Sequence, residues 1–161
     1  MSNNEACILA VAEISFMMKG FLKFPEPKTA IDIVETLNTL LEAENSLNSV
    51  REDVAGIITG LEDYVNTSEN SDLIFGFFIL LLTVSDLYIN EQCDTETALD
   101  YLEKAGNLFA PMLSLVDGEK ELIENVCAMF CDLGNRCKQL NTERALISGD
   151  KIIYEAEKIM S

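Results

Sequence analysis

The sequence predicts an all-α protein of about seven helices, packed as antiparallel hairpins around a central apolar helix at residues 72–90. Apolar residues recur every three or four positions along most of the chain, and polar or proline-containing breaks separate these segments. In the middle, the stretch from Leu73 to Ser85 carries no charge. A chain of 161 residues is long enough to bury a core of its own, so residues 1–161 are expected to form a single all-helical domain.

The first predicted helix runs from Glu5 to Phe24. Pro25 and Pro27 end it, because proline disfavours helix in the residue before it and has no backbone N–H to donate. Its apolar stripe consists of Cys7, Ile8, Val11, Ile14, Met18, Phe21 and Leu22. The second helix is expected to use Thr29 as its N-terminal cap. Its stripe consists of Ala30, Ile33, Val34, Leu37, Leu40 and Leu41.

The third predicted helix starts at a capping-box pattern, Ser49 followed three residues later by Glu52. Its buried face is formed by Val50, Val54, Ile57, Ile58, Leu61, Tyr64 and Val65. Gly56 and Gly60 lie four residues apart on or near this face. They allow another helix to approach closely, or they are small residues that the helix merely tolerates.

The central helix is expected to run from Asp72 to Asn90. A membrane-spanning helix needs about 18 or more consecutive apolar residues, whereas Asp72 and Asp86 close this run earlier. We therefore expect a helix that other helices cover on every side, and no membrane span.

The last three predicted helices follow the same spacing. The fifth begins near Asp94 or Thr95 and is expected to stop at Pro111; an Asp117-Gly118 turn precedes the sixth. Gly149 argues against an unbroken seventh helix. The buried residues expected in the three helices are Ala98, Leu99, Leu102, Ala105 and Phe109, then Leu122, Ile123, Val126, Met129, Phe130, Leu133 and Cys137, and finally Ala145, Ile152, Ile153, Ala156 and Ile159.

Short motifs recur at the second helix of each hairpin. Thr97–Asp100 reads TALD, Thr29–Asp32 reads TAID, and Arg144–Ile147 falls at the corresponding point of its own hairpin. Together with Gly134 before the last hairpin turn, these segments resemble the small-residue positions of tetratricopeptide repeats, over about half of the chain. The resemblance implies a superhelical stack whose concave side receives a peptide or helix from a partner, as in adaptors and secretion chaperones. It implies no catalysis.

The spacing of these motifs departs from that family. Tetratricopeptide repeats recur every 34 residues, whereas Ala30, Ala98 and Ala145 are 68 and then 47 residues apart. A compact bundle wrapped around the central helix therefore remains the alternative architecture.

The chain is strongly acidic, with a formal net charge of −17 and no histidine. Such a charge repels nucleic acid and anionic lipid and favours basic partners, although it also simply keeps a protein soluble. Two groups of acids are candidate partner-binding residues: Asp94, Glu96, Asp100 and Glu103 on the fifth helix, and Glu119, Glu121 and Glu124 at the start of the sixth. Acids of the second group also complement the dipole of a helix N-terminus.

The sequence offers few residues for catalysis. Without histidine the usual catalytic triads are excluded, and no glycine-rich phosphate loop is present. Cys127, Cys131 and Cys137 lie near one helical face and can bind a soft metal, but their spacing differs from that of structural zinc sites, so we expect them to pack in the core. We predict no catalytic residue, no cofactor and no metal.

The five cysteines also bear on location. They are an odd number, and no basic leader followed by an uninterrupted apolar segment opens the chain. We therefore expect free thiols in a reducing, cytoplasmic environment.

Three functional hypotheses follow. The first is a non-enzymatic protein-binding module (an adaptor, chaperone or immunity-type inhibitor) that docks a basic or amphipathic partner through a helical groove and an acidic surface. The alternative is an acidic nucleic-acid mimic that inhibits a nucleic-acid-binding enzyme, such as a phage anti-defence protein. The third is an enzyme with a carboxylate or thiol site. Oligomeric state stays open, because Phe16, Met17 and Phe24 on the outer side of the first helix can seal a homodimer.

Overall fold

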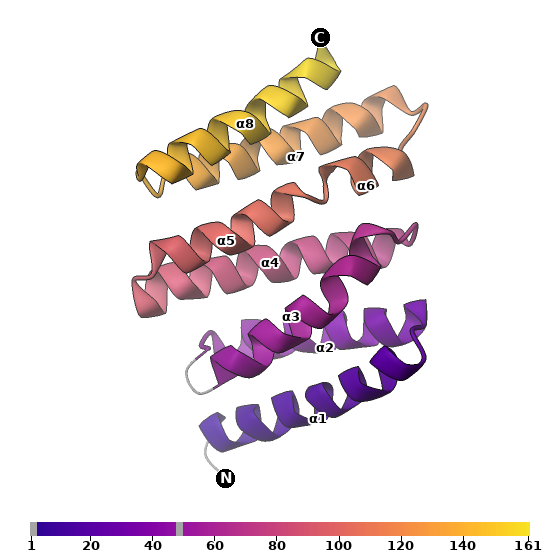
Figure 1. Cartoon of the computed structure of the whole chain (residues 1–161), viewed down its shortest axis with the longest axis vertical. Helices are drawn as coiled ribbons and strands as arrows, with labels where there is room; N and C mark the ends of the chain where they lie inside the picture. Colours follow the sequence, from indigo (N-terminus) through magenta and orange to yellow (C-terminus); the bar gives the residue numbers. More distant parts are fainter. Residues whose placement is uncertain (1–2, 48–49) are drawn as a thin grey trace.

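The chain is all-α in the computed structural model, which describes residues 3–47 and 50–161 (Figure 1). The described residues form eight α-helices and no strand. Seven of them have 12 residues or more, in agreement with the seven predicted, and the eighth is the short α6. The bounds are α1 Asn3–Lys23, α2 Pro27–Glu44, α3 Arg51–Asn66, α4 Ser71–Gln92, α5 Thr95–Gly106, α6 Phe109–Leu115, α7 Lys120–Lys138 and α8 Glu143–Met160.

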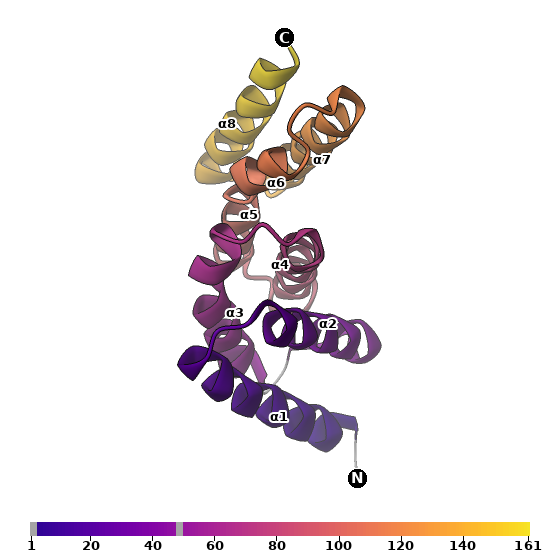
Figure 2. The same ribbon diagram turned by 90° about the vertical axis from the view of Figure 1, so that its right-hand side faces the viewer.

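The helices form an elongated stack, with α1 at one end and α8 at the other (Figure 1). Three antiparallel hairpins, α1–α2, α4–α5 and α7–α8, follow one another along it, and α3 and the short α6 lie between them. Seen from the side, α2, α4 and α7 lie in one layer and α3, α5 and α8 in the other (Figure 2). This layout is compatible with a helical-repeat-like fold.

The repeated alanines lie in the second helix of each hairpin, although α2 belongs to one layer of the stack and α5 and α8 belong to the other. Ala30, Ala98 and Ala145 each lie near the start of the second helix of a hairpin, in α2, α5 and α8, and each is fully buried. A small side chain at a buried position leaves room for a neighbouring helix to pack closely. α3 lies between the first two hairpins, which explains why the first interval between these alanines is the longer one.

α4 is the central helix, and it packs between α2 and α5 with further contacts to α3 and α6. By length and composition alone α4 could cross a membrane, but 56% of its most apolar 18-residue window is buried against the other helices. The expectation that it is covered on every side is wrong at Ile79, whose side chain is 49% exposed. A two-layer stack leaves one edge of a middle helix open, and Ile79 lies on that edge.

Most predicted core positions are buried, and the exposed exceptions on the outer helices share one cause. Ile8, Leu22, Leu122 and Ile159 were expected to face inward, but all four are exposed. They lie at the margin of an apolar stripe on α1, α7 or α8, near the ends of the stack, where fewer neighbouring helices remain to cover them. Periodicity finds the centre of a buried face better than its edges.

Two helix boundaries differ from the prediction. α2 begins at Pro27 with Glu26 as its N-cap residue, so Thr29 lies inside the first turn and is not the cap. Proline fits the first helical position, because the N–H that it lacks would have no partner there. The other expected cap, Ser49, lies outside the described residues, and α3 begins after Val50.

Pro111 does not end the fifth helix. α5 already ends at Gly106, and Pro111 lies in the first turn of α6, where a backbone N–H has no intrahelical partner to lose. Phe109, expected on the fifth helix, therefore belongs to α6 and is buried there.

α8 is unbroken, because Gly149 serves helix packing. A Cβ atom on Gly149 would lie 2.5 Å from the carbonyl oxygen of Gly134 in α7, and a Cβ on Gly134 would lie 2.7 Å from that of Gly149. The two glycines let α7 and α8 come into direct backbone contact. In α3, Gly60 faces Met18 of α1 at a similar distance, whereas Gly56 is open.

Candidate partner-binding site

An open groove of about 480 Å³ lies between α4 and α7, which are neighbours in the same layer of the stack. Its apolar lining comes from residues one helical turn apart on each helix: Phe78 and Leu82 on α4, and Met129 and Leu133 on α7. Its polar lining comes from α7 and the turn that follows it: Asp132, Asn135, Arg136 and Gln139.

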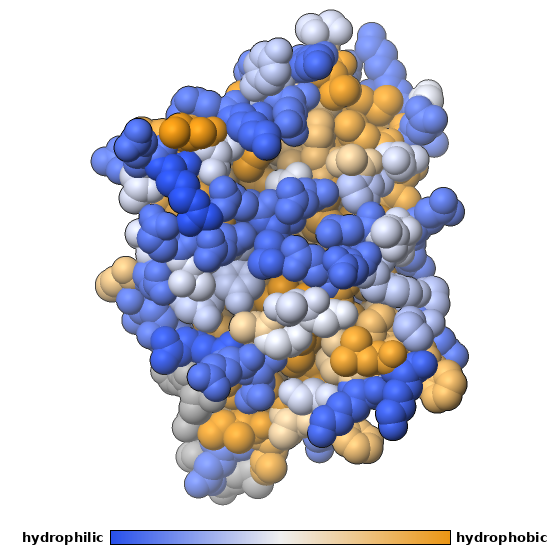
Figure 3. All heavy atoms as spheres, in the orientation of Figure 1, coloured by the Kyte–Doolittle hydropathy of each residue, from blue (hydrophilic) through white to orange (hydrophobic). Residues whose placement is uncertain are grey.

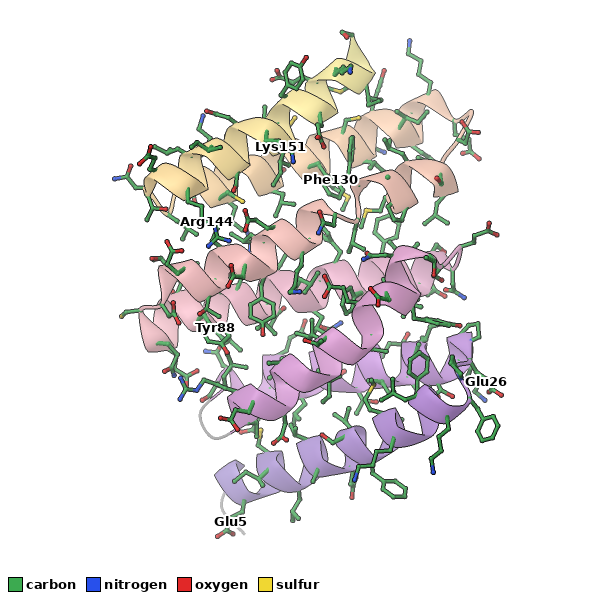
Figure 4. All side chains as sticks on the ribbon, in the orientation of Figure 1. Glu5, Glu26, Tyr88, Phe130, Arg144 and Lys151 are labelled. Atoms are coloured by element: carbon green, nitrogen blue, oxygen red, sulfur yellow. The ribbon has the colours of Figure 1, made fainter. Side chains whose placement is uncertain are left out.

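Three aromatic rings fix the spacing of the helices beneath this groove. The ring of Phe130 in α7 lies 5.4 Å from that of Phe78 in α4 and 4.8 Å from that of Phe109 in α6, measured between centroids. Figure 4 labels Phe130 where α7 faces α6. Aromatic pairs at such distances add favourable ring contacts to the burial of apolar area. These ring contacts join α4, α6 and α7 beneath the groove.

The rim of the groove carries both signs of charge. The guanidinium of Arg136 in α7 donates to the carboxylate of Asp86 in α4, with Nη1 3.2 Å from Oδ1. Both side chains are more than a third exposed, so this ion pair contributes little to stability and can exchange partners easily. Asp132, one turn before Arg136, adds an exposed carboxylate.

Ile79 extends the apolar surface of α4 beside the groove. It lies three residues before Leu82 and four after Phe75, so the three residues share one helical face. Ile79 is exposed, and Phe75 and Leu82 are partly exposed. Ile79, which was predicted to be buried, therefore belongs to the exposed surface next to the groove.

The predicted acids of α5 converge on one arginine of α8. Arg144 contacts Glu96 through Nη1 at 2.9 Å and Asp100 through Nη2 at 2.7 Å, and it also pairs with Glu103. Ser148 donates a hydrogen bond of 2.7 Å to the second oxygen of Glu103. These carboxylates raise the pKa of Arg144 further above its ordinary value. Three acids against one base leave this surface acidic, and hydrophilic side chains dominate it (Figure 3).

Asp94, the fourth predicted acid of this group, caps α5. Its carboxylate accepts hydrogen bonds from the backbone N–H of Thr97 at 3.0 Å and from the Thr97 hydroxyl at 2.7 Å. These bonds favour the charged form and lower the pKa of Asp94. Its position is explained by helix capping.

The second predicted group, Glu119, Glu121 and Glu124, lies at the start of α7. All three are exposed, and the start of α7 is on the opposite side of the stack from Arg144 (Figure 1, Figure 4). The structure therefore does not bring the seven predicted acids together into one surface. Glu119 occupies the N-cap position without a side-chain capping bond, where its charge complements the helix dipole.

The cysteines of α7 form part of the core. Cys127 and Cys137 are buried and Cys131 is partly buried; burial raises the pKa of all three thiols, that of Cys137 to about 11. Thiols of high pKa stay protonated near neutral pH, and a protonated thiol is a poor nucleophile and metal ligand. Within residues 3–47 and 50–161, no group of three or more cysteine, aspartate or glutamate side chains is arranged to hold a metal ion.

The sequence prediction placed both Met129 and Leu133 in the core; Leu133 is buried as predicted, whereas Met129 is partly exposed in a groove that the prediction did not include. A partly exposed apolar residue has the same spacing as a buried one, so periodicity alone gives no signal for it. Arg136 offered the only hint, as a basic residue within an apolar stripe.

The fold and the groove define a class: an all-α protein of stacked helical hairpins with an open groove of mixed apolar and polar lining on one layer. No protein family, curated protein or solved structure matches the chain.

Proposed function

We propose that this protein is a non-enzymatic, tetratricopeptide-like binding module that receives an amphipathic helix of a partner protein between α4 and α7. The observation that carries the proposal is the groove itself, with its apolar floor and charged rim. Helical grooves recognise partner helices through apolar side chains at helical spacing.

The groove residues suit such a partner. Leu82 on α4 and Met129 on α7 are partly exposed in the groove, whereas Phe78 and Leu133, one helical turn away on each helix, are buried beneath them. A partner helix with an apolar stripe at positions i, i+3 or i+4, and i+7 can cover these two exposed side chains. Ile79 enlarges the apolar contact at one side.

Charge favours a basic partner. The net charge of −17 raises the rate at which a basic protein encounters this one, and exposed acids such as Asp132 offer ion pairs at the rim. On this account the acids of α5 and of the start of α7 steer the approach, whereas the groove provides the affinity.

The membership in a tetratricopeptide-like class is part of the proposal. It rests on three hairpins in sequence, on the three buried alanines and on the Gly134–Gly149 contact between α7 and α8. The irregular intervals, filled by α3 and α6, distinguish the chain from a regular repeat array.

A photocrosslinking residue introduced at Leu82 or Met129 in living cells tests the proposal. We expect both positions to crosslink to the same partner protein, and the matched control at Ile147, which is exposed on α8, to give no such product. Equal products from all three positions, or none from the groove positions, would contradict the proposal.

The alternative of a nucleic-acid mimic receives less support from this geometry. A mimic needs a continuous row of negative charge, whereas the predicted acids form two separated groups, and Arg144 is embedded in one of them. Binding to a mimic's target weakens steeply as salt increases, whereas binding to an apolar groove does not. A salt titration of the captured complex therefore separates the two functions.

A further inference from the structure

The outer face of α1 carries exposed apolar side chains among its charged ones, although it lies at the end of the stack. Five large apolar side chains at or beside this helix are exposed: Ile8, Leu9, Phe16, Leu22 and Phe24. Phe16 and Phe24 are about three-quarters exposed, whereas Met17, which was also expected on this side, packs against the core. Hydrophobic side chains are visible at the α1 end of the molecule (Figure 3). Terminal helices of stacked-helix proteins normally carry a polar outer face.

Two of these five residues, Leu9 and Phe16, lie on one exposed seam of α1. Lys23 follows Phe16 at the same seven-residue spacing, and Ala12, Glu13, Lys19 and Gly20 lie between them at helical spacing. This is the spacing of helices that pair side by side. Gly20 is exposed and a Cβ atom there would meet nothing within 4 Å, so the seam includes a place where another helix can approach closely.

The charge of α1 differs from that of the rest of the chain. Its two acids, Glu5 and Glu13, are matched by two bases, Lys19 and Lys23, so α1 is neutral while the whole chain carries −17. A second copy of the chain therefore meets less repulsion at α1 than over most of the surface. Both acids lie in the amino-terminal half of the helix and both bases in the carboxyl-terminal half, which makes the helix complementary to itself when two copies run antiparallel.

We propose that α1 pairs with α1 of a second copy in an antiparallel, two-fold symmetric contact centred on Phe16. In that register Phe16 meets Phe16 of the second copy, Glu13 meets Lys19, and Ala12 meets Gly20. A parallel arrangement would instead place like charges opposite each other. An isologous contact of this kind closes after two copies.

This dimer is independent of the proposed function, because α1 contacts α2 and α3 while the groove lies between α4 and α7. The rival contact for the α1 face is the outer face of α8, where Ile147 and Tyr154 are exposed. A contact between α1 and α8 of the next copy is head-to-tail and builds open-ended assemblies. Acids and bases alternate along α8 instead of dividing between its two halves, so charge complementarity favours the pairing of α1 with itself.

Sedimentation equilibrium of the purified full chain tests the proposal. We expect a species of twice the chain mass of 17.9 kDa that dissociates on dilution. Phe16→Glu is expected to raise the dissociation constant about tenfold or more, because it places two carboxylates at the centre of the contact. The matched control, Ile147→Glu on α8, is expected to leave the mass unchanged.

A charge exchange tests the register. Glu13→Lys alone and Lys19→Glu alone are each expected to weaken the dimer, and the double variant is expected to restore it, since the opposite pairs form again in reverse. Circular dichroism of each variant verifies the fold, which matters for Lys19 because it also lines a shallow groove with Glu52 and Asp53. Three results would overturn the proposal. The wild type could be monomeric, or it could form open-ended assemblies that Ile147→Glu abolishes. The double variant could also dimerise no more tightly than the single variants.

Discussion

Replacing Gly149 with alanine tests the close contact between α7 and α8. In most helices this change stabilises the protein by about 0.5–1 kcal/mol, because glycine loses more backbone entropy on folding. Here the new methyl group would lie 2.5 Å from the carbonyl oxygen of Gly134, a backbone atom that moves only if the helix moves. Such overpacking costs about 1–3 kcal/mol. The net expectation is a loss of about 1–2 kcal/mol, which lowers Tm by roughly 2–8 °C for a domain of this size.

Gly56→Ala is the matched control for this experiment. Gly56 lies inside α3, is exposed, and has nothing within 4 Å of an added Cβ. Its replacement is therefore expected to raise the stability by about 0.5–1 kcal/mol. Thermal and urea unfolding of both variants give the two signs directly. If Gly149→Ala raises Tm as Gly56→Ala does, α7 and α8 do not pack as described.

The remaining predictions concern buried groups and the surface network. Burial raises the pKa of Tyr101 to about 12, so its contribution to stability is intact below pH 10 and is lost as the pH rises toward 12. Urea unfolding at pH 9 and pH 11 measures how much the free energy of unfolding falls over this range. We expect this fall to be about 1 kcal/mol smaller in Tyr101→Phe than in the wild type. An equal fall in both proteins would refute the prediction. When the folded protein is treated with iodoacetamide, mass spectrometry should find the exposed Cys93 modified first. The buried Cys127 and Cys137 should react only after unfolding. At a pKa of about 11, Cys137 has about 100-fold less thiolate than an ordinary thiol. Arg144→Ala is expected to lower Tm at low salt, because three neighbouring carboxylates then lose the base that they share, and the difference should shrink in about 0.5 M NaCl. A salt-independent difference would show that lost packing, and not charge, is responsible.

Local signals made most of the fold predictable. The stripes of α2, α3 and α5 are buried almost as expected, and Asp94 and Gly118 mark the boundaries that their capping and turn chemistry indicated. Proline fits a break between helices and the first turn of a helix equally well, and this explains two failed predictions. Pro27 follows the end of α1 as expected, but it also opens α2, so Thr29 is not the cap. Pro111 was expected to end the fifth helix, but it lies in the first turn of α6.

The groove could not be predicted in the same way, because it depends on how helices distant in sequence are spaced. Leu82 and Met129 are 47 residues apart, and nothing in either local pattern indicates that α4 and α7 leave a groove between them. The same holds for Arg144, which lies more than 40 residues from each carboxylate that it pairs with. Local periodicity identified which residues are apolar or charged, and tertiary packing decided which of them stay at the surface.

The affinity of the crosslinked partner for a groove variant tests the central claim most directly. With the partner in hand, titration calorimetry compares the wild type with Met129→Glu, which places a charge on the partly exposed wall of the groove, and with Ile147→Glu on α8 as the control. We predict that Met129→Glu weakens binding about tenfold or more while the helical circular dichroism is retained, and that Ile147→Glu has no effect. Unchanged affinity of a folded Met129→Glu variant would contradict the account.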